Sequence, residues 1–180
     1  MIYFVRHGQT NWNIEHKIQG QSDIPLNEMG KKQAELIAPQ LKDLKIERII
    51  SSDLSRALET AQIINTHLKL QITLDTRLRE FKYGQIEGVP SKDLTDEIWL
   101  KYHTKPELID AEAPWQAFAR TKDFIDEYAH SPSCILAVTH GGFIRMATYY
   151  KENPTQPFDG RKYWSDYVPR KFANTALIAF

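Results

Sequence analysis

Residues 2–8 read Ile-Tyr-Phe-Val-Arg-His-Gly, and residues 134–142 read Cys-Ile-Leu-Ala-Val-Thr-His-Gly-Gly. Each stretch is a short apolar run that leads directly into a turn containing His-Gly. A continuous apolar run of this length, bounded by glycine, is typical of a strand buried on both faces of a parallel sheet. The two stretches therefore predict two central strands, each followed at its carboxyl end by a histidine, His7 or His140.

Strand and helix patterns alternate along the rest of the chain. Further strands are expected at 48–51, 72–74 and 174–180. Helices are expected at 27–44, 54–68, 92–102, 115–130 and from Phe143 onward. This alternation predicts an α/β fold, a three-layer α/β/α sandwich with a mostly parallel central sheet.

Local signals add detail to these elements. Asn27 is expected to cap the first helix and Ser52 or Asp53 the second. Pro39 lies inside the first helical pattern and predicts a kink or two shorter helices there. The polar stretch 11–25 is expected to be a long loop.

Composition limits the classes of protein to consider. The 180 residues carry 23 basic and 23 acidic side chains, so no net charge favours nucleic acid or a membrane surface. Cys134 is the only cysteine and is expected to be a small buried hydrophobic residue. The apolar start reaches Arg6 too early for a signal peptide, and no segment approaches the about 20 apolar residues of a membrane helix. We expect one cytoplasmic domain over residues 1–180.

The two His-Gly turns indicate an anion pocket. In open α/β sheets ligands bind at the carboxyl ends of the strands, so His7 and His140 are expected to share one crevice. Glycine backbone can approach a ligand closely, and the helix after Gly142 would add its positive N-terminal end. Arg6 and Arg56 each follow a strand and carry a planar fork suited to phosphate oxygens. The alternative is that the glycines only make turns and the histidines only fill space.

Five motifs, in this order along residues 2–145, are similar to those of the histidine phosphatase superfamily, in the branch that includes cofactor-dependent phosphoglycerate mutase. They are Arg6-His7-Gly8-Gln9-Thr10-Asn11-Trp12-Asn13, Ile18-Gln19-Gly20 with Pro25-Leu26-Asn27-Glu28-Met29-Gly30, Ser51-Ser52-Asp53-Leu54-Ser55-Arg56-Ala57-Leu58-Glu59-Thr60-Ala61, Leu78-Arg79-Glu80-Phe81 with Gly84 and Glu87-Gly88, and Thr139-His140-Gly141-Gly142. The resemblance implies a single phosphoglycerate-mutase-like domain. It also implies a substrate-side excursion around 88–115 and a variable segment at 151–171.

The resemblance also implies roles for individual residues. His7 would be the nucleophile that accepts the phosphoryl group, and Glu80 would be the general acid and base. Arg6, Arg56 and His140 would hold the phosphoryl oxygens, with further contacts from Asn13 and from the backbone of Gly141. The reaction would need no metal ion and no cofactor, and the partner would be a small phosphate ester.

The implied activity is that of a metal-independent histidine acid-type phosphatase, a phosphomonoester hydrolase that works through phosphohistidine. One alternative is phosphoglycerate-mutase-type transfer, although no basic, proline-rich insertion like that of the mutases follows Pro90. A second alternative is a non-catalytic phosphate-binding regulatory module. A metallohydrolase is disfavoured because two arginines would repel a cation.

Two segments depart from the family pattern. Many hydrolytic relatives carry Gly-Glu-Ser where this chain has Ala111-Glu112-Ala113-Pro114. The segment 151–171 has three prolines and several aromatic and basic residues without a period. It is expected to cover the pocket, to form a surface excursion or to make an oligomer contact. The sequence leaves the oligomeric state open.

Overall fold

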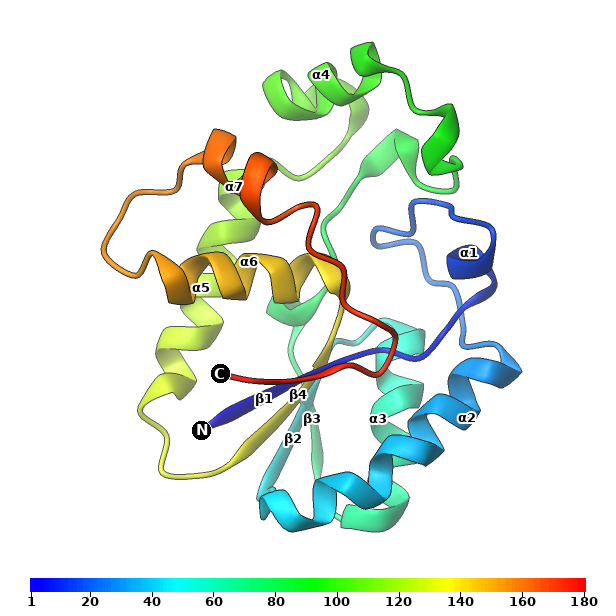
Figure 1. Cartoon of the computed structure of the whole chain (residues 1–180), viewed down its shortest axis with the longest axis vertical. Coiled ribbons are helices and arrows are strands. Elements are labelled where there is room, and N and C mark those ends of the chain that lie inside the picture. The colour runs from blue at the N-terminus through cyan, green and yellow to red at the C-terminus, as the bar shows by residue number, and fades with distance from the viewer.

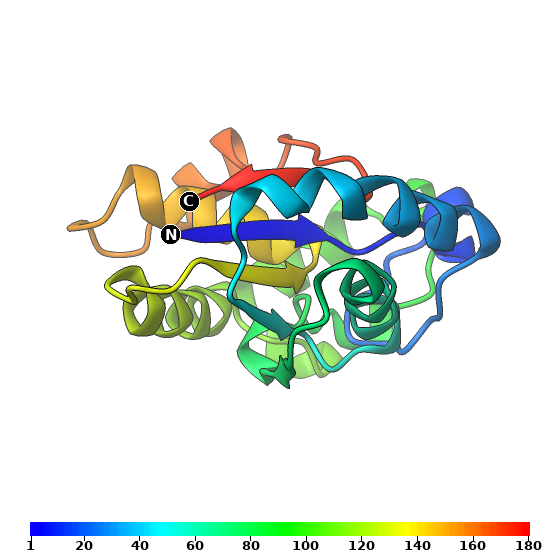
Figure 2. The same cartoon turned by 90° about the horizontal axis from the view of Figure 1, so that it is seen from below.

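Five strands form one sheet in the order β3-β2-β4-β1-β5 in the computed structural model, which describes all 180 residues (Figure 1). The strands are β1 (Ile2–Arg6), β2 (Arg48–Ser51), β3 (Ile72–Leu74), β4 (Ile135–Thr139) and β5 (Leu177–Ala179). The first four run parallel, and β5 pairs antiparallel with β1 at the sheet edge. Figure 2 shows β1 and β5 side by side, with the two chain ends close together. The predicted mostly parallel α/β sheet is confirmed.

Seven α-helices and five short 3-10 helices connect the strands. The α-helices are α1 (Asn11–Ile14), α2 (Glu28–Ile37), α3 (Ser55–Leu68), α4 (Asp96–Thr104), α5 (Pro114–Ala129), α6 (Gly141–Glu152) and α7 (Gly160–Asp166). The 3-10 helices are η1 (Ala38–Leu44), η2 (Thr76–Leu78), η3 (Gly84–Ile86), η4 (Ser91–Asp93) and η5 (Pro106–Ile109).

Alternating side chains of the central strands feed two separate cores. Phe4 and Ala137 point to a core shared with α5 and α6, which includes Phe124 and Phe143. Their neighbours along the strands, Val5 and Val138, point to the other core, which α2, η1 and α3 complete. Successive strand residues face opposite sides, so a strand buried on both sides must be apolar throughout. The uninterrupted apolar runs of β1 and β4 follow from this requirement.

Several local predictions need correction. The expected loop at 11–25 contains the short helix α1, because Thr10 and Asn13 form a reciprocal capping box. Neither Ser52 nor Asp53 caps α3: the preceding residue is Leu54, which makes no side-chain cap. The Ser52 hydroxyl contacts His140 instead, and Asp53 pairs with Arg79.

Three element boundaries also differ from the prediction. Pro39 ends α2 as expected, since the chain continues from Ala38 as the 3-10 helix η1. The last long helix, α6, begins at Gly141 rather than at Phe143. Helix α7 was not predicted; Asp159 caps it by accepting from the N–H groups of Arg161 and Lys162.

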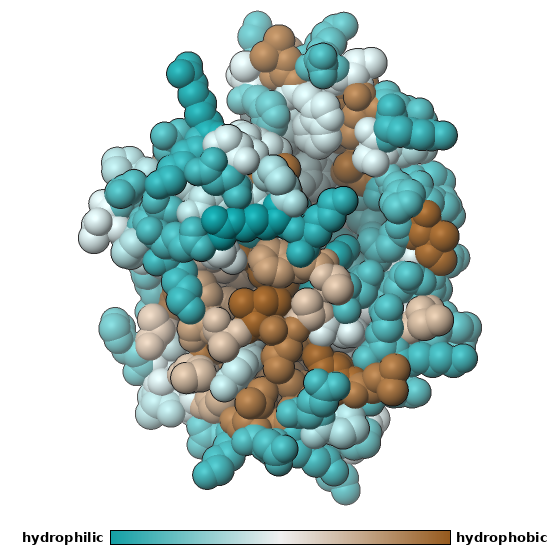
Figure 3. All heavy atoms as spheres, viewed as in Figure 1, coloured by the Kyte–Doolittle hydropathy of each residue, from teal (hydrophilic) through white to brown (hydrophobic).

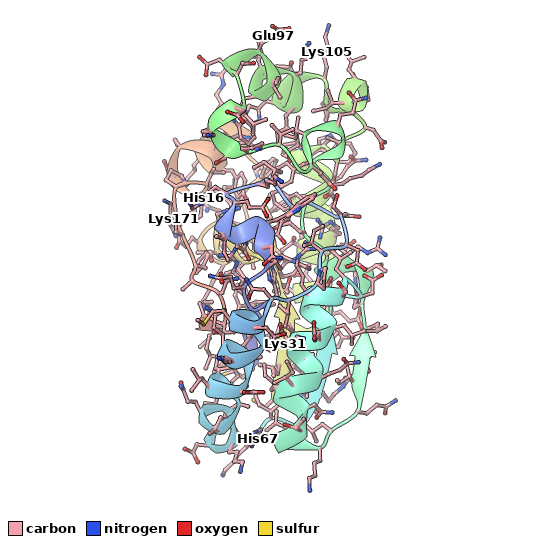
Figure 4. The ribbon with its side chains drawn as sticks, turned by 90° about the vertical axis from the view of Figure 1, so that its right-hand side faces the viewer. His16, Lys31, His67, Glu97, Lys105 and Lys171 are labelled. Carbon is pink, nitrogen blue, oxygen red and sulfur yellow. The ribbon has the colours of Figure 1, made fainter.

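The segment 88–115 forms a cap of η4, α4 and η5 beyond the sheet (Figure 1). In Figure 4 the labelled residues Glu97 and Lys105 mark the outer end of this cap, and His67 marks the opposite end of the molecule. Tyr102 is fully buried and packs edge-on against Trp164 of α7. The cap therefore meets α7 through aromatic side chains.

Three further features concern the apolar surface, the helices and Cys134. Figure 3 shows apolar side chains gathered over the lower half of the face on which β1, β5 and α2 lie. None of the helices has the length and apolar character needed to cross a bilayer. Cys134 is only partly buried; burial raises the pKa of its thiol, and its Sγ lies 3.3 Å from the carbonyl oxygen of Leu44.

The turn after β1 crosses the start of α2 at very short range. A Cβ on Gly30 would lie 2.1 Å from the carbonyl oxygen of Gln9. In an open helix Gly→Ala stabilises by roughly 1 kcal/mol, but here the added methyl must displace backbone. We expect Gly30→Ala to lower the free energy of unfolding by about 1–3 kcal/mol, measured by urea denaturation. Gly160→Ala is the control, because its Cβ would meet nothing closer than 3.7 Å; equal stabilities of the two variants would contradict the close-approach explanation.

Candidate active site

The predicted site residues come together at the carboxyl ends of three adjacent strands. His7 follows β1, His140 follows β4, and Arg56 lies in the first turn of α3, just after β2. The imidazole ring centroids of His7 and His140 are 5.1 Å apart. All three side chains are buried. The structure therefore brings the predicted residues together in one closely packed cluster.

His7 is held in an orientation suited to a nucleophile. Its Nδ1 lies 2.7 Å from the carbonyl oxygen of Gly8, so Nδ1 carries the proton and Nε2 keeps its lone pair. The N–H of Gly8 donates to Thr60 Oγ1 at 3.0 Å, which fixes the turn. Burial, together with the charges of Arg56 and Arg6, holds the pKa of His7 well below its usual value. The imidazole is therefore neutral at pH 7.

His140 is fixed by Ser52. Its Nε2 lies 2.9 Å from Ser52 Oγ, and Ser52 Oγ accepts from the N–H of Leu54 at 3.3 Å. With the serine hydroxyl donating to Nε2, the proton of His140 would lie on Nδ1. That Nδ1 is buried without a hydrogen-bond partner in the protein. Burial also holds the pKa of His140 well below its usual value, so this neutral ring offers one N–H donor.

Arg6 and Arg56 are oriented by backbone carbonyls rather than by carboxylates. Arg56 donates to the carbonyl oxygens of Ser22 and Gly20 at 2.8 and 2.6 Å, and Arg6 donates to that of Phe172. The Nε atoms of both arginines are buried and unpaired. Burial lowers the pKa of Arg56 to about 10, so the group stays charged at neutral pH. Both arginines keep positive charge available for an anion.

The carboxylate of Glu80 is held at the start of α6. Its Oε1 accepts from the N–H of Phe81 and its Oε2 from the N–H of Gly142, both at 2.9 Å. A Cβ on Gly142 would lie 2.0 Å from Glu80 Oε1, so a side chain here would displace the carboxylate. The N-terminal end of this helix, expected to contribute to an anion site, thus also holds a carboxylate of the protein. Its Gly142 amide holds Glu80, whereas Gly141 lies in the first turn, where amides lack intrahelical acceptors.

Glu112 and Arg120 support the Glu80 backbone from α5 and the residues before it. Glu112 accepts two hydrogen bonds from Arg120, at 2.7 and 2.9 Å. Arg120 donates in turn to the carbonyl oxygens of Arg77, Arg79 and Glu80. Although residues 111–113 differ from Gly-Glu-Ser, they keep the glutamate. Through Arg120, Glu112 holds the backbone of the loop that carries Glu80.

Glu87 supports Arg56 indirectly. Its carboxylate accepts from the N–H groups of Gln21, Ser22 and Tyr83 and from the hydroxyl of Ser22. The same loop supplies the two carbonyls that orient Arg56. Glu87 therefore ties this loop to the segment after Glu80.

Asn13 is oriented by a residue that the sequence did not suggest. Its Oδ1 accepts from the N–H of Thr10 at 3.0 Å and from Nδ2 of Asn174 at 3.3 Å. With its oxygen engaged, Asn13 leaves its own NH₂ group available as a donor. Asn174 Nδ2 also donates to the carbonyl of His7 at 3.0 Å. Only the three-dimensional path of the chain from α7 to β5 brings Asn174 to the site.

Part of the segment 151–171 packs onto the core, whereas Pro154 to Pro157 lie exposed at the surface. Tyr163 and Tyr167 are buried in a cluster with Phe81, Met146 and Tyr149. Its basic residues mostly point elsewhere: Lys162 donates to Asn153, and Arg170 pairs with Glu152. A separate cavity of about 1310 Å³ lies between α4, the start of α5 and α7. None of its lining residues belongs to the site described above.

Comparison with known proteins agrees with this architecture. The sequence profile of the histidine phosphatase superfamily (branch 1) matches residues 2–159. The probable phosphoglycerate mutase GpmB of Yersinia pestis is 47% identical over 102 residues, which are 56% of this chain and 47% of that protein. The chain thus spans about half the length of the curated relatives it matches.

Two solved structures superpose over 98% of this chain. The mycobacterial glucosyl-3-phosphoglycerate phosphatase in complex with VO3 has a TM-score of 0.80 and 25% identity, with 90% of that chain covered. A phosphoserine phosphatase from Entamoeba histolytica, in complex with phosphoserine, has a TM-score of 0.78 and 25% identity, with 87% covered. The protein belongs to the histidine phosphatase superfamily.

The buried histidines predict a decline of stability in acid. An unfolded histidine takes up a proton as pH falls through its ordinary pKa of 6.5, whereas His140 in the folded protein stays neutral. The unfolded state then binds more protons, so the free energy of unfolding falls. Between pH 7.5 and 5.5 each such histidine costs about 1.4 kcal/mol.

The measurement is urea unfolding of the wild type and His140→Asn at both pH values. The variant should lose about 1.4 kcal/mol less than the wild type across this interval. His67→Asn, which removes an exposed histidine at the far end of α3 (Figure 4), is the control and should follow the wild type. If the free energy of unfolding declined equally in the wild type and in His140→Asn, His140 would not be a buried, neutral histidine.

Removal of the Asn174 amide should weaken turnover without unfolding the protein. Asn174→Ala loses two hydrogen bonds worth about 1–1.4 kcal/mol in total, so kcat/KM on an aryl phosphate should fall by roughly 5- to 10-fold. Asn65→Ala is the matched control, because Asn65 Nδ2 also donates to a backbone carbonyl, that of Leu70, far from the site. Equal activity of the two variants would rule out a role for Asn174 in the site.

Proposed function

We propose that this protein is a metal-independent phosphomonoester hydrolase that acts on a small phosphorylated metabolite through a phosphohistidine at His7. The observation that carries the proposal is the state of His7. It is a neutral, buried imidazole whose Nδ1 is tied to Gly8 and whose Nε2 is free. Two arginines with unpaired Nε atoms stand beside it.

In the first step, the Nε2 lone pair attacks phosphorus and the bond from phosphorus to the ester oxygen breaks. Arg6, Arg56 and the Nδ1–H of His140 stabilise the charge on the phosphoryl oxygens, with Asn13 and the Gly141 N–H as further donors. Glu80 gives its proton to the departing alkoxide. Each Glu80 oxygen accepts one backbone N–H and keeps a second lone-pair position for that proton.

In the second step, Glu80 takes a proton from water while the water oxygen attacks the phosphorus of phosphohistidine. The phosphorus–nitrogen bond breaks, inorganic phosphate forms and His7 Nε2 regains its lone pair. The Glu80 proton is then ready for the next turnover. Dividing one displacement into two lowers each barrier, which is the usual advantage of a covalent intermediate.

The charge distribution supports a reaction without a metal ion. No group of three or more His, Cys, Asp or Glu side chains in the chain is arranged to hold a metal. Arg6 and Arg56 already supply the positive charge that a metal would otherwise provide to a phosphoryl group.

Mutase activity is the second candidate, and the 47% identity to a probable phosphoglycerate mutase favours it. That identity covers 47% of the relative, so it does not carry the relative's activity to this chain. The two activities differ in product: hydrolysis of 3-phosphoglycerate releases inorganic phosphate, whereas a mutase yields 2-phosphoglycerate. We propose hydrolysis.

Rapid acid or alkaline quench with a ³²P-labelled phosphate ester tests the proposal. Wild-type protein treated with EDTA should carry a base-stable, acid-labile phosphoryl group, and His7→Ala should carry none. Glu80→Gln should accumulate the phosphoenzyme on an aryl phosphate, because the phenolate leaves without a proton while water still needs a base. Steady turnover should fall by about 100-fold or more in Glu80→Gln.

The control is Glu59→Gln. Glu59 lies on α3, and its carboxylate pairs with Lys31 rather than with a residue of the site. Label retained in His7→Ala would refute the phosphohistidine. Loss of turnover on EDTA treatment, restored by a divalent ion, would refute the metal-independent route.

A further inference from the structure

Two neutral imidazoles lie side by side in the site, yet the proposed reaction needs them in opposite states. The ring centroids of His7 and His140 are 5.1 Å apart, and both side chains are buried. His7 must offer a lone pair to phosphorus, whereas His140 must offer an N–H to a phosphoryl oxygen. In a neutral imidazole one nitrogen carries the proton and the other the lone pair, so the hydrogen bond at one nitrogen decides the state of the other.

The partner of His7 leaves its ring no choice. Its Nδ1 lies 2.7 Å from the carbonyl oxygen of Gly8, and a carbonyl oxygen can only accept, so Nδ1 carries the proton. The partner of His140 is the hydroxyl of Ser52, whose Oγ lies 2.9 Å from Nε2. A hydroxyl can donate or accept. The state of His140 therefore depends on where the hydroxyl proton of Ser52 points.

The hydroxyl of Ser52 has a single acceptor within reach. Ser52 is completely buried. Its Oγ accepts from the N–H of Leu54 at 3.3 Å, and the only other hydrogen-bond contact of this Oγ is with Nε2 of His140. A buried donor without an acceptor is costly, so buried hydroxyl groups nearly always donate. The acceptor open to the hydroxyl proton of Ser52 is therefore Nε2.

The surroundings of the other ring nitrogen agree with a proton on it. The charges of Arg56 and Arg6 act on His140, and the Nε atoms of both arginines are buried without partners. Nδ1 of His140 is buried without a partner as well. A lone pair at Nδ1 would attract an N–H of a nearby arginine. With an N–H at Nδ1, all three groups are donors that can bind phosphate oxygens.

We propose that Ser52 is a positioning residue that decides which of the two histidines can be the nucleophile. By donating to Nε2 it fixes the proton of His140 on Nδ1. His140 can then only donate to the phosphoryl group, and His7 alone presents a lone pair to phosphorus. This inference rests on the proposed hydrolase function and explains how two buried, neutral histidines take different parts in it.

The adjacent serine has a purely structural hydroxyl and provides a matched control. Ser51 is buried as completely as Ser52, and its hydroxyl donates to the carbonyl oxygen of Ser52 at 2.8 Å. Neither serine caps α3, which has Leu54 at its N-cap position and no side-chain cap. Ser51→Ala therefore removes a buried hydroxyl next to the site without removing the hydrogen bond to His140.

NMR of protein with ¹⁵N-labelled histidine reads the tautomer of His140 directly. At neutral pH the wild type should carry the proton of His140 on Nδ1 and a lone pair on Nε2, with the signals assigned by their loss in His140→Asn. Ser52→Ala should shift the population towards the Nε2–H form, because the positive charge of the arginines then favours a lone pair at Nδ1. Ser52→Thr keeps a hydroxyl and should retain the wild-type tautomer.

Turnover of an aryl phosphate by EDTA-treated protein is the second readout. Loss of one donor to a developing phosphoryl charge costs about 100-fold or more, and a mixture of tautomers loses part of that. Ser52→Ala should therefore lower kcat/KM by about 10- to 100-fold, whereas Ser51→Ala should change it by less than about 3-fold. Ser52→Thr should recover most of the loss.

The proposal would be overturned by a wild-type His140 protonated on Nε2, by a fall in the activity of Ser52→Ala without a change of tautomer, or by equal losses in Ser51→Ala and Ser52→Ala. The wild-type spectrum decides the first of these without any variant, so the test does not depend on the folding of Ser52→Ala. If the wild type cleaved no ester but carried the proton on Nδ1, the hydrolase function would fall while the tautomer assigned to Ser52 stood.

Discussion

The pairing of β1 with β4 is the constraint on which the site depends. The strands run parallel with Val5 opposite Val138 and Arg6 opposite Thr139. The N–H of His7 continues this ladder by donating to the carbonyl of Thr139 at 2.9 Å. This register brings the two His-Gly turns level at one edge of the sheet. A slip of one residue would turn every side chain of β1 to the opposite face, which both apolar cores resist.

Around that edge the protein concentrates positive charge that it does not neutralise. Carbonyl oxygens orient Arg6 and Arg56, and carboxylates lie one step further out, where Glu87 and Glu112 hold loops in place. Carbonyl dipoles position a guanidinium without cancelling its charge, whereas a salt bridge would compete with the substrate. The two histidines stay neutral in the same field because burial and the arginines both disfavour their protonation. An electropositive pocket therefore keeps His7 unprotonated, as its proposed role as nucleophile requires.

Sequence patterns predicted the elements that bury apolar residues regularly. The strands at β1, β2 and β4 are visible as short apolar runs, and Pro39 marks the end of α2. The pattern could not reveal α7, whose formation depends on aromatic contacts of Tyr163 with α6 rather than on its own period. Family motifs pointed to His7, His140, Arg56 and Glu80, and the structure places these side chains in one cluster. Their catalytic roles remain predictions.

Residues that reach the site from afar carried no local signal. Asn174 is polar and lies in an irregular stretch, and its contact with His7 spans nearly the whole chain. Arg120 sits on the polar side of an ordinary amphipathic pattern, yet it holds the backbone of the acid-bearing loop. Such contacts depend on tertiary structure, because loop paths across a sheet are not encoded in a short periodicity.

Helix α6 joins two tasks on one rigid element. Its first turn binds the carboxylate of Glu80 through the amide of Gly142, and the next residue, Phe143, is buried in the core against Phe4 and Phe124. The position of the Glu80 carboxylate is thus fixed by the same helix that completes this core. In this architecture a single peptide bond separates the amide that orients Glu80 from a side chain that completes the core.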